Sequence, residues 1–252
     1  MKNYRIIAQV LLLISIMFSG QAMAQSTIFN IPTTDTVAKK HVYGEFDFMP
    51  QVPAYDDDSR LYLYNPRVVV GAPGNVEFGV NFPTYNYRSS MDSETFAYIQ
   101  PNAKWRFYNN DNYGIALAVG GILNAPLNRR EGQDTWGLLY GLFSKKIKTG
   151  NYGPRFHGGV YGAVSSDDDP AWVERRHVGA ILGYEQPVQK RISIVADWFS
   201  GKNGVGYFTP GISITLPKNG LLNAGYMIGN DSWENSNATK NRLIMLYYGI
   251  TF

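Results

Sequence analysis

The feature that most constrains the fold is an alternation of apolar residues with small or polar residues at a period of two. In the clearest example Ile115, Leu117 and Val119 share one strand face, and Ala116 and Ala118 lie on the other. The pattern recurs in about a dozen segments of roughly ten residues, long enough for tilted strands to cross a bilayer. Side chains alternate between the two faces of a strand, so the sequence predicts an all-β fold.

Short and long connections between these segments alternate along the chain. The short ones are rich in turn-forming residues and cover 72–75, 109–112, 148–154, 187–190 and 217–220. The long ones cover 49–59, 88–94, 124–134, 165–176, 201–205 and 230–241. Short periplasmic turns, longer external loops and an even number of strands are typical of outer-membrane barrels. We therefore predict a twelve-stranded antiparallel transmembrane β-barrel over residues 41–252, with both termini on the periplasmic side.

A soluble β-sandwich is the main alternative, since it also alternates and turns often. Two features of the pattern weigh against it. The apolar face is aromatic near its ends as well as aliphatic in its middle, and the opposite face reads as small or polar instead of forming a second core. In a barrel the first face meets lipid and the second lines the lumen.

The N-terminal residues predict export. Residues 1–5 form a short region made basic by Lys2 and Arg5, residues 6–18 are largely apolar, and Ala22-Met23-Ala24 has the small-residue pattern of a cleavage site. The apolar run is shorter than the roughly 20 residues of a spanning helix. We expect a cleaved signal peptide over residues 1–24 and a periplasmic segment over residues 25–40, which either dangles or folds up as a small plug.

Composition excludes several classes of protein. The chain has no cysteine, which rules out disulfides and a lipid-modified N-terminal cysteine. The whole chain has 23 basic and 20 acidic residues. Because Lys2 and Arg5 belong to the signal, the numbers of basic and acidic residues are nearly equal in the mature protein. Nothing in this balance indicates a nucleic-acid partner.

The last ten residues indicate how such a barrel closes. One face of this strand is apolar or aromatic throughout: Ile244, Leu246, Tyr248, Ile250 and Phe252. Chain ends are usually frayed and polar, whereas a closing strand gains from an aromatic anchor at the membrane interface.

With this strand and the signal, the chain resembles Gram-negative outer-membrane β-barrel proteins. The resemblance implies that the closing strand is the tag read by the barrel-assembly machinery, and that the barrel contacts outer-membrane lipid and lipopolysaccharide. Twelve-stranded members of this class include nucleoside channels, small acidic-oligosaccharide porins, phospholipases and deacylases. Architecture alone does not choose among them.

Strand parity places a set of polar residues in the lumen. They are His41, Tyr43, Glu45, Asp47, Asn65, Arg67, Glu77, Asn81, Gln100, Asn102, Lys104, Arg106, His157, Tyr161, His177, Glu185, Ser193, Asp197, Thr209, Ser213, Thr215 and Asn223. Most of the charges lie on the first four strands, and Glu45, Asp47, Arg67, Glu77, Lys104 and Arg106 are the candidate selectivity residues. Two interpretations stay open: a salt-bridged network that stiffens a narrow lumen, or a charged constriction that selects solutes by sign and size.

No catalytic or metal-binding pattern emerges. Outer-membrane phospholipases carry a Ser two residues after the catalytic His, but here His157 is followed by Gly159, His177 by Gly179 and His41 by Tyr43. The acidic runs 56–58 and 167–169 resemble solvated loops more than divalent-cation sites.

We therefore predict a non-enzymatic outer-membrane barrel without a cofactor, most simply a passive channel for small polar or charged solutes whose identity the sequence leaves open. The alternatives are a structural or assembly barrel with an occluded lumen and an outer-membrane lipid hydrolase, whose triad would have to assemble from distant residues.

Overall fold

The computed structural model describes residues 26–52, 59–89, 92–128, 135–148, 152–165, 178–202, 205–230 and 241–252. These residues form one antiparallel sheet of thirteen strands. The strands are β1 (Val42–Pro50), β2 (Arg60–Ala72), β3 (Val76–Asn81), β4 (Thr84–Arg88), β5 (Ser93–Asn110), β6 (Ile115–Pro126), β7 (Trp136–Lys146), β8 (Arg155–Ser165), β9 (Val178–Gln189), β10 (Ile192–Phe199), β11 (Tyr207–Leu216), β12 (Gly220–Gly229) and β13 (Arg242–Thr251). Within the described ranges, no helix has the length and apolar character needed to span a membrane.

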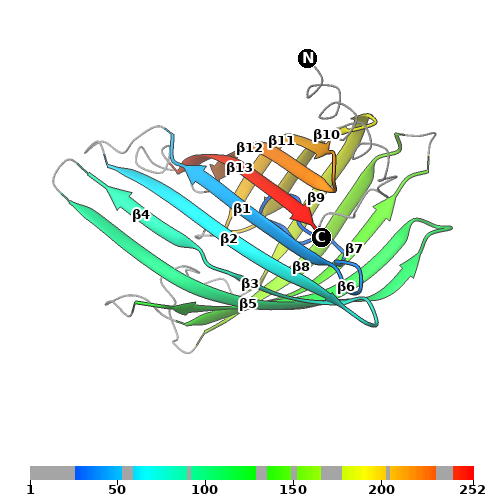
Figure 1. The fold of residues 1–252 in the computed structure, drawn as a ribbon, viewed down its shortest axis with the longest axis horizontal. Helices are drawn as coiled ribbons and strands as arrows, with labels where there is room; N and C mark the ends of the chain where they lie inside the picture. Colours follow the sequence, from blue (N-terminus) through cyan, green and yellow to red (C-terminus); the bar gives the residue numbers. More distant parts are fainter. Residues whose placement is uncertain are drawn as a thin grey trace, which may run out of the picture.

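The sheet closes on itself to form a barrel (Figure 1). β1 pairs with β13 on one side and with β2 on the other. β3 and β4 share one position between β2 and β5, because the strand is interrupted at Phe82 and Pro83. Proline has no backbone N–H to donate to a sheet, which accounts for the break. The prediction of an all-β barrel with twelve antiparallel strands is confirmed.

Large apolar side chains cover the outer face of the barrel. Exposed members are Phe46, Val68, Phe78, Trp105, Leu139, Val160, Leu182, Ile194 and Ile212. The predicted parity is confirmed at β6, where Val119 is 42% exposed on the outside while Ala116 and Ala118 are buried on the inside. A continuous apolar surface of this extent is unusual on a protein surrounded by water and matches the lipid-facing band of a membrane barrel.

The closing strand lies where the sequence predicts. Phe252 donates its backbone N–H to the carbonyl oxygen of Val42 at 2.8 Å, and Val42 donates to the carbonyl oxygen of Phe252 at 3.1 Å. Ile244, Leu246 and Tyr248 are exposed on the outer face. Ile250 is partly exposed, and Phe252, at the end of the seam, is 71% exposed.

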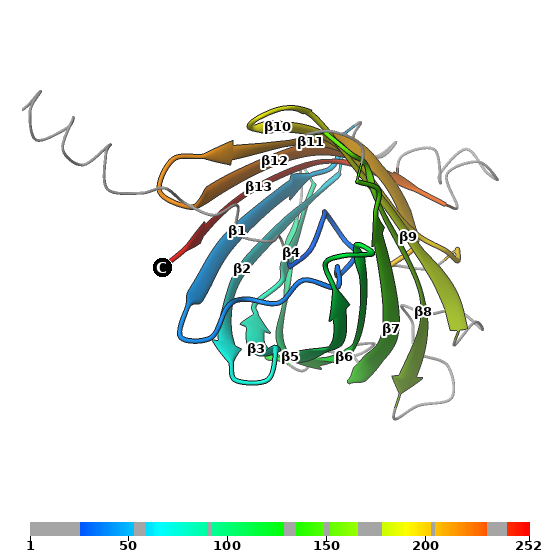
Figure 2. The ribbon, with the colours of Figure 1, turned by 90° about the vertical axis from the view of Figure 1, so that its right-hand side faces the viewer.

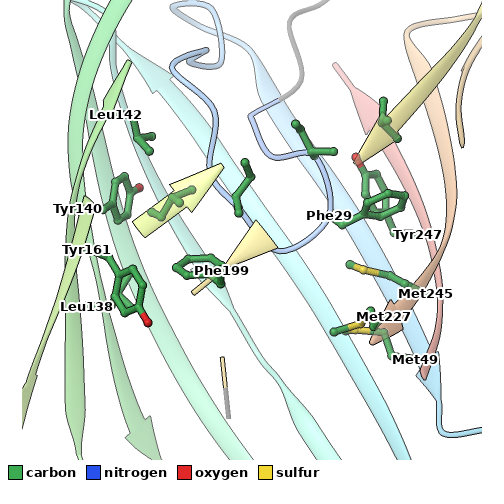
Figure 3. Packing of buried hydrophobic residues seen from close by; sticks show 14 of the residues in the cluster. Phe29, Met49, Leu138, Tyr140, Leu142, Tyr161, Phe199, Met227, Met245 and Tyr247 are labelled. Carbon is green, nitrogen blue, oxygen red and sulfur yellow. The ribbon is translucent and has the colours of Figure 1, made fainter. Parts of the chain in front are cut away.

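A second apolar cluster lies inside the barrel, so the prediction that the inner face is small or polar is wrong there. Its members on the barrel wall include Met49, Leu138, Tyr140, Leu142, Tyr161, Phe199, Met227, Leu243 and Met245. Figure 3 shows several of them facing the lumen from different strands. The physical reason is that Ile28, Phe29 and Ile31, which precede the barrel in sequence, belong to the same cluster. The lumen is thus packed by side chains from the wall and from the N-terminal segment.

Candidate functional site

Residues 26–37 lie inside the barrel, and we call this segment the plug. Figure 2 shows it as the blue chain that enters the ring of strands before β1. The plug folds back on itself, because Ile28 donates to the carbonyl oxygen of Ile31 at 3.1 Å and Thr33 donates to that of Ser26 at 2.9 Å. Of the two alternatives that the sequence left open for residues 25–40, the described part of the segment has the plug conformation.

Glycines on the barrel wall leave space for the plug and the residues that follow it. A Cβ at Gly71 would collide with the carbonyl oxygens of Val37 and Ala38, where the chain passes from the plug towards β1. A Cβ at Gly225 would lie only 2.7 Å from the ring of Phe29. These positions let a second segment approach the sheet closely, a recurrent use of glycine in strands.

A first charge cluster lies beside the start and the end of the plug. It consists of Glu45, Asp47, Arg67, Glu77 and Lys104. Arg67 pairs with Glu45 at 2.9 Å, and Lys104 pairs with Glu77 at 3.0 Å. Both pairs join residues directly opposite each other on neighbouring strands, the arrangement in which cross-strand charges stabilise a sheet.

The plug completes this first cluster. Ser26 donates its hydroxyl to Glu77 Oε1 at 2.7 Å, and Lys104 Nζ donates to the Ser26 carbonyl oxygen at 3.0 Å. The backbone N–H of Val37 donates to Glu77 Oε2 at 2.7 Å. Both carboxylate oxygens of Glu77 therefore bind the plug, one at each end of the segment.

A second charge cluster binds Asp35. Arg155 holds this carboxylate with two guanidinium nitrogens, one of them at 2.8 Å from Oδ1. Arg106 lies 3.7 Å away. Burial alone would raise the pKa of Asp35, but the charge of Arg155 and its hydrogen bond hold that pKa below the ordinary value.

Asp197 anchors the turn of the plug. Its Oδ2 accepts the backbone N–H groups of Phe29 at 2.9 Å, Asn30 at 2.7 Å and Ile31 at 3.0 Å. Asn223 donates to the carbonyl oxygen of Ile28 at 3.0 Å. These bonds satisfy backbone groups that would otherwise be buried without partners, which is costly.

A Ser–His–Glu chain lies in the wall beside the plug. Ser144 Oγ is 2.7 Å from His157 Nδ1, and His157 Nε2 is 2.6 Å from Glu185 Oε1. These are the residue types of a hydrolytic triad. However, Thr34 of the plug donates to Ser144 at 2.8 Å and Ser144 is only 1% exposed. The three residues Ser144, His157 and Glu185 thus contact the plug through Ser144, and none of them borders the cavity described next.

A cavity of about 590 Å³ lies in the lumen beside the plug, a size typical of small-molecule sites. The plug borders it with Ser26, Thr27, Phe29, Asn30 and Pro32. The polar wall residues that border it are Asp47, Asn65, Arg67, Glu77, Asn81, Gln100, Asn102 and Lys104. Apolar and aromatic wall residues include Met49, Leu61, Leu63, Trp136, Leu138, Tyr140, Phe199, Met227, Leu243 and Met245.

The structure brings most of the candidate selectivity residues together. Glu45, Asp47, Arg67, Glu77 and Lys104 form the first charge cluster, whereas Arg106 reaches the second through Asp35. Two other residues that were predicted to face the lumen are not buried: His41 is partly exposed and Thr215 is exposed, because both lie close to strand ends.

Sequence reasoning missed Asp35, Ser144 and Arg155. Arg155 has the same parity as His157 and could have been found from it. Asp35 gave no signal, because the plug has no repeating pattern. The predicted signal over residues 1–24, the acidic runs 56–58 and 167–169, and His177 lie outside the described residues.

Comparison with solved structures decides the fold class. An outer-membrane channel from Pseudomonas putida F1 superimposes with a TM-score of 0.56 at 14% identity, covering 87% of this chain and 98% of the other. The chain has the fold of an outer-membrane β-barrel.

Lower TM-scores of 0.49 are found for two other barrels. Outer membrane phospholipase A from Escherichia coli is 12% identical and covers 86% of this chain and 94% of its own. The translocator domain of the autotransporter NalP from Neisseria meningitidis is 10% identical and covers 84% of this chain and 87% of its own. No protein-family model and no curated protein sequence matches the chain.

Proposed function

We propose that the protein is an outer-membrane channel for small polar or charged solutes that is closed by its own plug. The observation that carries this proposal is a closed barrel whose lumen is occupied by a segment held by side-chain bonds instead of strand pairing. The least stable parts of a structure open locally without global unfolding, so a segment held in this way is able to leave the lumen while the sheet stays intact.

The charged side chains that bind the plug support the choice of solute. Lys104 and Glu77 bond to Ser26, and Arg155 pairs with Asp35, while the plug is docked. Departure of the plug turns these groups towards the passage. Fixed charges around a narrow passage select solutes by sign and size.

Conductance in planar bilayers tests this proposal. We expect the full chain to conduct rarely and a variant lacking residues 26–37 to conduct steadily. Absence of conductance in the deletion variant, once its barrel is shown to be folded by heat-modifiable migration, would favour the scaffold alternative with a permanently occluded lumen.

A reversible cross-link tests the role of the plug in the intact protein. The chain has no native cysteine, and the hydroxyl oxygens of Thr34 and Ser144 lie 2.8 Å apart. We expect the pair Thr34→Cys and Ser144→Cys to stop channel opening when oxidised and to restore it when reduced. Each single cysteine variant is the control and should respond to neither treatment.

Ion selectivity tests the candidate residues. In the variant lacking residues 26–37, neutralising Arg67, Lys104 and Arg106 should shift ion preference towards cations, because the acidic residues of the lumen remain. The shift should shrink at high salt, where screening shortens the reach of each charge. Reversal potentials under a salt gradient measure it, and an unchanged selectivity would place these side chains away from the path of ions.

The apolar outer face and the solved barrels support a position in the outer membrane. The proposal includes export through cleavage after Ala24, contact of the outer face with lipid and lipopolysaccharide, and recognition of the closing strand by the barrel-assembly machinery. It includes no catalytic step. Cleavage of phospholipid by the detergent-purified protein, abolished by Ser144→Ala, would contradict it and favour the hydrolase alternative.

A further inference from the structure

We propose that the cavity beside the plug is a binding site for a small organic ammonium ion with an apolar body. The proposal goes beyond channel activity, since it concerns which ligand the cavity recognises and does not require the plug to leave. It stands on the charge balance of the first cluster and on the chemistry of the wall around it.

The charge balance leaves one carboxylate without a cation. Glu45 pairs with Arg67, and Glu77 pairs with Lys104. Asp47 is only 3% exposed and borders the cavity. Among the described residues, no cationic side chain lies within ion-pairing distance of it.

The hydrogen bonds of Asp47 are also incomplete. Asn65 donates to its Oδ2 at 2.8 Å, while its Oδ1 accepts no hydrogen bond from a donor among the described residues, and the neighbouring Glu45 carboxyl adds like charge beside it. A buried carboxylate is expensive unless it is paired and hydrogen-bonded. An ammonium group that enters the cavity supplies both the missing charge and the missing donor.

An apolar surface begins two residues beyond Asp47 on β1. Met49 follows it by two residues on the same face of β1, opposite Leu63 of β2. Met227, Leu243 and Met245 of β12 and β13 belong to the same buried cluster as Met49, and Figure 3 shows Met49, Met227 and Met245 close together on one side of the lumen. Thioether side chains adapt readily to apolar ligands of irregular shape.

Aromatic side chains border the same cavity. Trp136, Tyr140 and Phe199 come from β7 and β10. Aromatic faces attract cations as well as apolar groups. The lining therefore combines a buried carboxylate that has no salt bridge with an apolar and aromatic surface that an inorganic cation, which stays hydrated, does not use.

Calorimetric titration of the detergent-purified full chain tests the proposal with three probes. Phenethylammonium carries both the charge and the apolar body, 2-phenylethanol is its near-isosteric neutral control, and ammonium chloride is the cation without the body. We expect phenethylammonium to bind most tightly, and Asp47→Asn to weaken it at least tenfold without changing the affinity for 2-phenylethanol. Asp111→Asn, in an exposed turn, is the matched control and should have no effect.

Several results would overturn the inference: equal affinity of Asp47→Asn and the unaltered protein for phenethylammonium, an equal loss for the alcohol, or equally tight binding of ammonium chloride. Met245→Gln covers the case in which Asp47→Asn fails to fold, because it keeps the carboxylate and should still weaken phenethylammonium. Unchanged affinity of Met245→Gln for phenethylammonium would show that the apolar surface does not contribute to the site and would contradict the proposal. Calorimetry requires no conduction, so a failed channel proposal and a failed ligand proposal remain distinguishable.

Discussion

Replacing Asp197 by Asn should release the plug more often, because one carboxylate oxygen accepts three backbone N–H groups of the plug turn at 2.7 to 3.0 Å. Hydrogen bonds to a charged group contribute about 1.5 to 3 kcal/mol each, and neutral ones about 0.5 to 1.5 kcal/mol. Asn retains an acceptor oxygen but loses the charge, so the loss per bond is about 1 kcal/mol or more.

Three donors that share one oxygen are not additive, so we take about 2 to 4 kcal/mol for the whole set. At 1.4 kcal/mol per factor of ten, the ratio of undocked to docked plug should rise about 30-fold to about 700-fold. Open probability in single-channel recordings measures this ratio, and protease cleavage within residues 26–37 gives a second readout that does not depend on conduction.

Asp47→Asn is the matched control for this experiment. It removes another buried carboxylate of the lumen, but its hydrogen bond goes to Asn65 of the wall. We expect its plug to stay docked. A folded Asp197→Asn barrel with the open probability and protease resistance of the unaltered protein would refute the view that these bonds hold the plug.

Three further predictions concern pH, the lipid face and the closing strand. The pKa of Asp35 in the docked plug lies below its ordinary value of 3.8. The Asp35 carboxylate therefore stabilises docking fully above pH 3.8, and this stabilisation is lost as the pH falls through the lower pKa of the docked state. Open probability should rise in strongly acidic buffer, and the variant Asp35→Asn should be less sensitive to pH. Leu117→Arg should cost about 2 to 4 kcal/mol if Leu117 faces lipid at mid-bilayer, whereas Ala116→Arg should act through crowding in the lumen; equal effects in urea unfolding from vesicles would contradict the assignment of faces. Phe252→Asp should lower the yield of heat-modifiable barrel in outer membranes, and normal assembly of that variant would argue against an anchoring role of this residue.

The inward or outward orientation of the strand residues could be predicted from sequence, because it follows a local rule. Successive side chains of a strand point to opposite faces and the apolar face is the outer one, so Val119 is assigned to the outside and Ala116 to the lumen. The same rule placed Glu45 and Arg67 inward, and the register of β1 with β2 makes them a pair. The break at Pro83 was not anticipated, although a proline in a strand interior signals one.

The packing inside the lumen could not be predicted, because it depends on contacts between residues that lie far apart in the chain. Met227 and Met245 on inward positions contradict the usual polar lumen, and they make sense only with Phe29 and the cavity beside it. Ser144, His157 and Glu185 are adjacent through the order of β7, β8 and β9, so a search for neighbouring residues in sequence does not find them. Asp35 lies 120 positions from Arg155.

The position of the plug before β1 also has a consequence for how the barrel is made. The plug bonds to β3, β5, β8, β10 and β12, so the part of the chain synthesised first contacts strands that are synthesised much later. Contacts of such separation form late, because the entropy of closing a long loop must be overcome first. Before β1 and β13 join, the segment can enter the growing sheet from the side; afterwards it can enter or leave only through the two ends of the barrel. A chain that closes this seam around an empty interior would therefore have to thread its own N-terminus back through one of these ends, which makes closure before docking the slower route to the plugged barrel.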